Sequence, residues 1–165
     1  MKFNLIDKIE RLDTDRIVAV KHVSRAEEYL ADHFPTFPVL PGVMMLEAIT
    51  QAAGWLLHHR RGFSRSMAVL KEARNVKYGR FVAPGDWLTV EVEWVKDAGD
   101  GAGGVFKATG SVGVPPLPAV SARIELAYFN LGDKEPELAY FDERLRGHTR
   151  SRFELLQHVG HALRV

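Results

Sequence analysis

The sequence predicts an α+β fold in which an antiparallel sheet wraps around one long, buried central helix. Residues 41–58 are apolar on almost every side, and a helix of that kind must be surrounded by other elements. Several other segments alternate apolar and polar residues with the period of two that is typical of strands buried on one face. A chain of 165 residues is long enough for one unit of this kind.

The central helix is predicted to begin at Pro41, because the missing N–H of a proline has no intrahelical partner in the first turn. The few polar side chains of this helix lie close together, since Glu47 and Gln51 are four residues apart with a threonine beside them. These polar residues argue against a membrane span over the apolar residues 39–57. Residues 58–61, His-His-Arg-Arg, are expected to form a solvated helix end.

Strands are expected on both sides of the helix. The segments 16–23 and 67–78 have strand-like composition, although charged residues interrupt the second. The clearest alternation covers 86–95, and a glycine-rich turn then leads into a strand over 105–112. After a run of prolines, which cannot sit inside a central strand, the alternation resumes over 120–128. About five long antiparallel strands should therefore form the sheet.

The chain changes character after residue 131. We therefore expect one domain over residues 1–131 and a C-terminal extension over residues 132–165. Charged residues dominate the first part of the extension. Apolar residues then recur at helical spacing: Phe153, Leu156, Val159 and Leu163. This spacing predicts a short amphipathic helix that docks on the domain.

The composition excludes several classes of function. Lys and Arg number 22 against 21 Asp and Glu, so no net field attracts a nucleic acid. The absence of cysteine excludes disulfides and thiolate metal sites and fits a reducing compartment. The first residues carry acids among apolar side chains, unlike a signal peptide, so a cytoplasmic protein is expected. We expect no metal site, because His158 and His161 have no third ligand near them, and no cofactor.

The segment before the central helix carries the residues best suited to chemistry. Prolines at 35, 38 and 41 force an extended, rigid approach to the helix, which holds His33 on a stiff loop. Gly42 follows at the helix N-terminus, where unpaired amides can stabilise developing negative charge. Glu47 is expensive to bury as an anion, so it should pair, face a cavity or hold a proton. A base, a carboxyl group and an amide donor suit proton transfer next to a carbonyl.

The run of residues 33–51, HFPTFPVLPGVMMLEAITQ, resembles the signature of the β-hydroxyacyl-acyl carrier protein dehydratases. That signature contains HFP, two further prolines, PGV, then EA and Q, and its spacing agrees here without an insertion. Residues 3–9 and 21–24 are similar to the family's FLLVDRV and KNVT, and residues 76–86 are similar to its VKFRRPVVPGD. The resemblance covers about residues 3–130.

The resemblance implies a hot-dog fold, assembled as a homodimer with shared active sites or as a trimer of dimers. It also implies the removal of water from a 3-hydroxyacyl thioester to give the trans-2-enoyl product. In such a reaction His33 takes the α-proton, and Glu47 of the partner subunit assists departure of the hydroxyl. The amide of Gly42 polarises the thioester carbonyl, the backbone carbonyl of Val39 orients the histidine, and Gln51 has a supporting role.

The substrate is expected to be a 3-hydroxyacyl chain on acyl carrier protein or in acyl-CoA. Candidates for the wall of its acyl tunnel are Phe34, Met44, Met45, Tyr78 and Phe81. A basic surface for an acidic carrier is expected from Arg60, Arg61, Arg65, Lys71, Arg74, Lys77 and Arg80.

Two other functions stay open. A hot-dog thioesterase would use Glu47 to activate water, and a non-catalytic accessory protein would only bind acyl chains or their carrier. The second alternative is kept open by departures from the family pattern: Asp32 stands where the family has glycine, and Gly79 and Phe81 replace an arginine and a proline.

Overall fold

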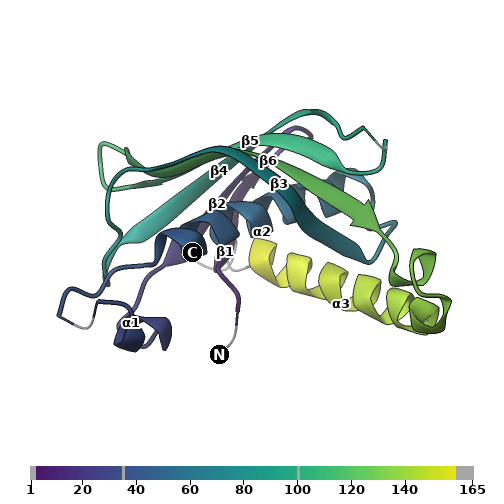
Figure 1. Ribbon diagram of the computed structural model, residues 1–165, viewed down its shortest axis with the longest axis horizontal. Helices are drawn as coiled ribbons and strands as arrows, with labels where there is room; N and C mark the ends of the chain where they lie inside the picture. The colour runs from purple at the N-terminus through teal and green to yellow at the C-terminus, as the bar shows by residue number, and fades with distance from the viewer. Residues whose placement is uncertain (1–2, 35, 100, 159–165) are drawn as a thin grey trace.

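A six-stranded antiparallel sheet curves around the long helix α2 (Figure 1). The computed structural model describes residues 3–34, 36–99 and 101–158, and within them the strand order is β1-β2-β4-β5-β6-β3. The elements, in chain order, are β1 (Lys8–Leu12), β2 (Arg16–His22), α1 (Tyr29–Asp32), α2 (Gly42–Arg60), β3 (Met67–Tyr78), β4 (Trp87–Asp97), β5 (Gly104–Val112), β6 (Leu117–Phe129), two short 3-10 helices η1 (Leu131–Asp133) and η2 (Pro136–Leu138), and α3 (Ala139–His158). The predicted α+β fold with a sheet around a central helix is confirmed.

The central helix α2 supplies much of the core. It has 19 residues, and Ile49, Leu56 and Leu57 are fully buried against the sheet. Each such side chain stabilises the fold by about 1.5–3 kcal/mol relative to an exposed one. The helix begins one residue after Pro41 and ends at Arg60, two residues beyond the predicted end.

The strands differ from their predicted bounds mainly where they are short or irregular. β3 has the predicted bounds, whereas the five-residue strand β1 was not predicted. β6 begins at Leu117 and contains Pro118, although the prolines were expected to lie outside it. Pro118 is tolerated because it pairs with Ser111 directly after a register shift in the β5–β6 ladder.

The C-terminal extension forms a helix of 20 residues, longer than the predicted short one. α3 lies on the same side of the sheet as α2 (Figure 1). Phe153 and Leu156 are buried, as their spacing predicted, whereas Val159 and Leu163 lie outside the described residues. The ring of Phe153 packs 5.9 Å from that of Trp55 and 5.2 Å from that of Phe63, measured between centroids, so the apolar face of α3 covers the C-terminal half of α2.

Asp142 fixes the start of α3 to the sheet. Its carboxylate accepts hydrogen bonds from the hydroxyl of Ser66 and from the amides of Leu131 at 2.8 Å and Gly132 at 3.0 Å. These donors, with the hydroxyl of Ser66 first, hold the pKa of Asp142 below its usual range. None of the helices in the described ranges is long and apolar enough to cross a membrane.

Candidate active site

The N-terminus of α2 presents free backbone amides. The amide of Leu40 donates to Val82 O at 2.7 Å, which ties the approach loop to the segment before β4. Pro41 O accepts from the amides of Met44 and Met45, whereas those of Gly42 and Val43 donate to no backbone oxygen within the described residues. Unpaired amides at the positive end of a helix can stabilise an oxyanion.

His33 lies at the end of α1, on the loop that leads to α2. Its amide donates to Tyr29 O at 3.2 Å, and its half-exposed ring contacts the ring of Phe34 with centroids 4.4 Å apart. Phe34 has a φ of 50°, a left-handed conformation that is unusual for a bulky side chain and that often occurs at functional sites. Val39 is buried, but its carbonyl accepts no hydrogen bond from the His33 ring within the described residues.

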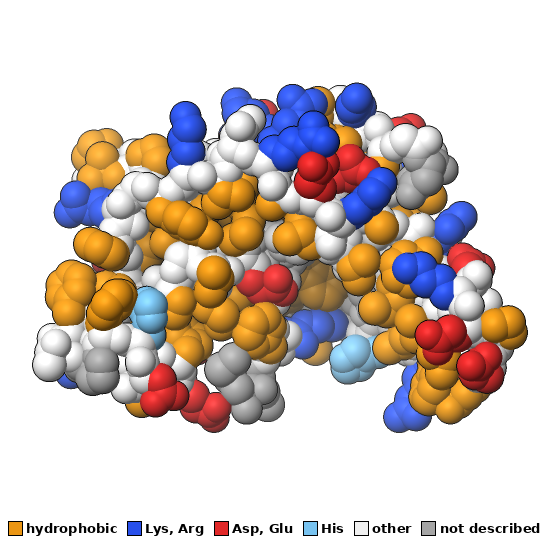
Figure 2. All heavy atoms as spheres, in the orientation of Figure 1, with side chains coloured by type: hydrophobic (Ala, Val, Ile, Leu, Met, Phe, Trp, Pro, Cys, Tyr) orange, Lys and Arg blue, Asp and Glu red, His pale blue; other side chains and the backbone are white. Residues whose placement is uncertain are grey.

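Exposed aromatic side chains surround the start of α2. Phe34 is 58% exposed and Phe81 is 64% exposed, and Phe81 meets Phe37 edge to face with centroids 5.6 Å apart. The ring of Tyr78 lies so close to Gly42 that an added Cβ would be 3.1 Å from its Cε1. Hydrophobic side chains gather over this face of the molecule (Figure 2). An apolar patch of this kind indicates a binding surface.

The other two tunnel candidates are buried in the core. Met44 and Met45 belong to the main hydrophobic cluster beneath α2 and are 8% and 4% exposed. Of the five candidates, Phe34, Tyr78 and Phe81 are therefore the ones that a ligand can reach from the surface.

Glu47 lies in a groove of about 320 Å³ between α2, β3 and α3. The groove is lined by Phe3, Asn4, Glu47, Thr50, Gln51, Gly54, Trp55, His58, Ser66, Met67, Ala68, His148, Thr149 and Arg152. The polar positions of α2 that were identified in the sequence all face it. The half-buried carboxylate of Glu47 accepts a hydrogen bond of 3.0 Å from Nε2 of Gln51.

Gln51 links the N-terminal segment to Glu47. Its Oε1 accepts from the amide of Leu5 at 2.9 Å, and its Nε2 donates to Phe3 O at 3.1 Å as well as to Glu47. One side-chain amide therefore fixes the direction of the carboxylate and holds the backbone of residues 3–5 against α2. These three hydrogen bonds are the contacts that bear on the supporting role expected for Gln51.

The variant Gln51→Met is expected to lower the free energy of unfolding by about 1–3 kcal/mol, because it leaves the amide of Leu5 and the carbonyl of Phe3 without partners. Urea titration measures this change. Gln157→Met is a matched control, since the side chain of Gln157 makes no hydrogen bond within the described residues. Equal stability of the two variants would contradict the role given to Gln51.

His58 closes the far end of the groove and is buried, so the expectation that it belongs to a solvated helix end was wrong. Its Nδ1 lies 3.3 Å from the hydroxyl of Tyr128, which also accepts the amide of Arg65 at 3.1 Å. The rings of His58 and Phe63 stack. Burial disfavours the imidazolium and lowers the pKa of His58 to about 4. The sequence signal is its position, eleven residues after Glu47 and on the same helix face.

Acid is expected to destabilise the protein through His58. The folded state keeps this imidazole neutral down to a pKa of about 4, whereas the unfolded chain binds the proton near the ordinary value of about 6.5. The stabilisation is complete above about pH 6.5 and is lost as the pH falls towards 4, at a cost of about 3 kcal/mol. Urea unfolding across this range, compared with His58→Leu, measures the effect. An NMR titration of His58 with a midpoint near the ordinary value would contradict it.

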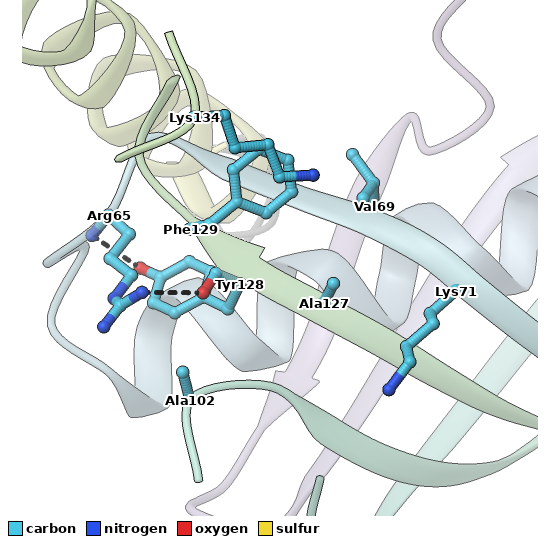
Figure 3. A pocket seen from close by; sticks show the side chains of 8 residues that line it. All are labelled: Arg65, Val69, Lys71, Ala102, Ala127, Tyr128, Phe129 and Lys134. Carbon is cyan, nitrogen blue, oxygen red and sulfur yellow. Dashed lines mark hydrogen bonds between the residues drawn. The ribbon is translucent and has the colours of Figure 1, made fainter. Parts of the chain in front are cut away.

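A second hollow, of about 510 Å³, lies over the paired strands β3 and β6 and is lined by no predicted site residue except the proposed carrier contacts Arg65 and Lys71 (Figure 3). The guanidinium of Arg65 donates to Tyr128 O at 3.1 Å, and the ammonium of Lys134 lies 4.0 Å from the centre of the Phe129 ring. Both cations therefore already have interaction partners within the chain.

His33 is not among the residues of the same chain that line the groove of Glu47. His33 accompanies the aromatic residues at the start of α2, and Glu47 faces the groove further along the helix. The predicted pair therefore belongs to two separate parts of the chain surface. His161 and the side chain of His158 lie outside the described residues.

Comparison with known proteins identifies the family. A family model described as the FabA-like domain matches residues 1–115. The chain belongs to the FabA-like family. The 3-hydroxyacyl-[acyl-carrier-protein] dehydratase FabZ of Solibacter usitatus is 41% identical over 95 residues, which are 57% of this chain and 59% of that protein. FabZ of Clostridium kluyveri is 35% identical over 133 residues, which are 80% of this chain and 88% of that protein. This FabA-like chain thus resembles FabZ-type dehydratases, although it spans only 59% of the Solibacter relative.

Solved structures confirm the hot-dog fold of this FabA-like chain. The dehydratase heterocomplex ApeI:P from Xenorhabdus doucetiae matches with a TM-score of 0.62 and 19% identity, covering 78% of this chain and 85% of that one. The PaaI protein of E. coli matches with a TM-score of 0.55 and 14% identity, covering 72% and 80%. Helix α3 lies beyond the residues that the FabA-like model matches.

Proposed function

We propose that this FabA-like protein dehydrates 3-hydroxyacyl thioesters to trans-2-enoyl thioesters, with acyl carrier protein as the carrier, in the synthesis of fatty acids or related lipids. The observation that carries the proposal is the placement of Glu47, which Gln51 holds in a groove on the same helix whose N-terminal amides are free and whose first residue lies against the exposed ring of Tyr78. The curated relatives carry the name of this reaction.

In the proposed reaction, His33 removes a proton from C2 of the substrate while the amide of Gly42 stabilises the negative charge that develops on the thioester oxygen. Glu47 donates a proton to the hydroxyl on C3. The electron pair of the C2–H bond forms the double bond between C2 and C3, and the C3–O bond breaks as water leaves. The exposed aromatic residues around α2 exclude water from the thioester.

We propose a homodimer in which each site combines His33 and Gly42 of one subunit with Glu47 of the other. Three observations support it. His33 does not line the groove of Glu47 in the same chain, and β3 lies at the edge of the sheet with a backbone available for pairing. The exposed aromatic patch also needs a cover. Light scattering measures the oligomeric state.

Fewer cations remain available for the acidic carrier than the sequence suggested. Five of its seven cations form ion pairs within the chain: Arg60 with Asp15, Arg61 with Asp97, Arg65 with Asp133, Lys71 with Glu125 and Arg74 with Glu72. Lys77 and Arg80 form none within the described residues; Lys77 directly precedes Tyr78 and Arg80 directly precedes Phe81 in the sequence. We propose that these two cations contact the acidic carrier, which makes its binding sensitive to salt.

The experiment that tests the proposed function presents 3-hydroxyacyl chains on carrier protein and on coenzyme A to the full chain. Enoyl thioester absorbance at constant free thiol supports dehydration, whereas release of thiol without enoyl product shows a thioesterase. Binding without either product shows an accessory protein. Absence of enoyl product at every chain length, on both carriers, overturns the proposal.

A further inference from the structure

Helix α3 forms one wall of the groove that holds Glu47. His148, Thr149 and Arg152 line it from α3, together with His58 from α2 and Ser66 from the residue before β3. All three α3 residues lie beyond the matched family domain, which ends at residue 115. This chain therefore adds its own wall to a site whose other residues lie in the shared domain.

The wall is held firmly. The carboxylate of Asp142 fixes the start of α3 through three hydrogen bonds, and Arg146 donates to the side chain of Asn130 at 3.3 Å. Further along, Phe153 and Leu156 are buried against the core. Residues 148–152 lie between these two anchors, so their positions are set by the fold rather than by a ligand.

The order of groups in the substrate determines which part of it meets α3. In the proposed dimer the thioester carbonyl lies at the start of α2 in one subunit, and C3 lies at Glu47 of the other. The acyl chain beyond C3 therefore continues from Glu47 into the groove of that second subunit. From Glu47 the lining leads past Gly54 to His58, which is about 16 Å further along the axis of α2. An acyl chain long enough to run along this lining therefore meets the α3 wall with its far end.

The groove is polar where a plain fatty chain would need an apolar end. Thr50 donates to Leu46 O at 2.9 Å, and Ser66 donates to Asp142, so these two hydroxyls already have partners. The guanidinium of Arg152 forms no ion pair or hydrogen bond within the described residues, and the residue is half-buried. A methyl end would remove water from this guanidinium and give it no partner, whereas a carboxylate would pair with it.

We infer that α3 selects the far end of the substrate, and that the preferred acyl chain ends in a carboxylate that Arg152 binds, with His148 beside it. The inference rests on the proposed dehydratase function and names its substrate class: 3-hydroxyacyl thioesters with a carboxylate at the distal carbon. Arginine suits this task because its planar donors match both oxygens of a carboxylate.

The test compares carboxyl-ended and methyl-ended 3-hydroxyacyl pantetheine thioesters of equal length, in hexanoyl, octanoyl, decanoyl and dodecanoyl pairs. The ratio of kcat/KM within a pair is expected to favour the carboxylate in the wild type. In Arg152→Met the ratio should fall by about 10- to 100-fold at the preferred length. Arg144→Met is the matched control, because Arg144 lies on the same helix, is exposed and does not line the groove. An unchanged ratio in Arg152→Met overturns the inference.

A binding measurement separates this inference from the proposed function. Acyl pantetheine thioesters without the 3-hydroxyl group cannot be dehydrated, so calorimetry with the carboxyl-ended and methyl-ended forms reports selection alone. Tighter binding of the carboxyl-ended form that depends on Arg152, without enoyl product from the hydroxylated form, supports the selection and overturns the dehydratase. Equal binding of both forms, or enoyl product from methyl-ended chains only, overturns the selection and leaves the dehydratase standing.

Discussion

The variant His33→Ala is expected to lower kcat for dehydration by about 100- to 10 000-fold, the contribution of a positioned general base. KM should change little, because the ring is half-exposed and its only aromatic contact among the described residues is with Phe34. Initial rates of enoyl thioester formation measure the effect. The thermal unfolding of the variant should match that of the wild type, since the loop is fixed by backbone contacts and prolines.

A suitable control for this variant is His22→Ala. His22 contacts Trp87 with the two rings tilted and their centroids 4.7 Å apart, and it lies outside the proposed site, so its loss should leave kcat near the wild-type value. If His33→Ala keeps more than about a tenth of the wild-type kcat, His33 is not the general base, since a general base raises the rate by at least about 100-fold.

The variant Glu47→Gln is expected to lower kcat by a similar factor of about 100- to 10 000-fold, because an amide cannot protonate the departing hydroxyl. The fold should be kept, since the new side-chain carbonyl can still accept the hydrogen bond from Gln51 that Glu47 accepts at 3.0 Å. Circular dichroism and urea unfolding check the fold, and enoyl formation checks the chemistry. Full activity of Glu47→Gln would remove Glu47 from the mechanism.

Mixing the two inactive variants tests whether the subunits share their sites. In a random mixture half of the dimers contain one chain of each kind, and each mixed dimer has one site with both groups intact, so about a quarter of the wild-type activity should return. Refolding each variant alone gives the baseline. No recovery on mixing, with dimers confirmed by light scattering, would place both groups in one chain.

The long apolar helix could be predicted from the sequence because an apolar surface on every side requires a cover, and that cover is the sheet. β1 and α1 were missed because five and four residues are too few for a periodic signal. The length of α3 was underestimated because its first half is charged and gains its order from Asp142, a tertiary contact.

The candidate site likewise contains residues that the sequence predicted and residues that it missed. The local signals of Gly42, Glu47 and Gln51 were readable because they belong to one helix with a fixed period. The burial of His58 was hidden by its basic neighbours, and the approach of Arg152 to the groove joins segments about a hundred residues apart. Such contacts depend on packing rather than on any spacing in the sequence.

The hydrogen bonds of Gln51 to the backbone of Phe3 and Leu5 have a practical consequence for handling the protein. A purification tag or a fusion partner placed directly before these residues would pull on the same peptide groups that orient the carboxylate of Glu47. Any such addition should therefore be separated from Phe3 by a long flexible spacer, so that the carboxyl group of Glu47 keeps its orientation. The turnover of the tagged protein should then be compared with that of the untagged protein.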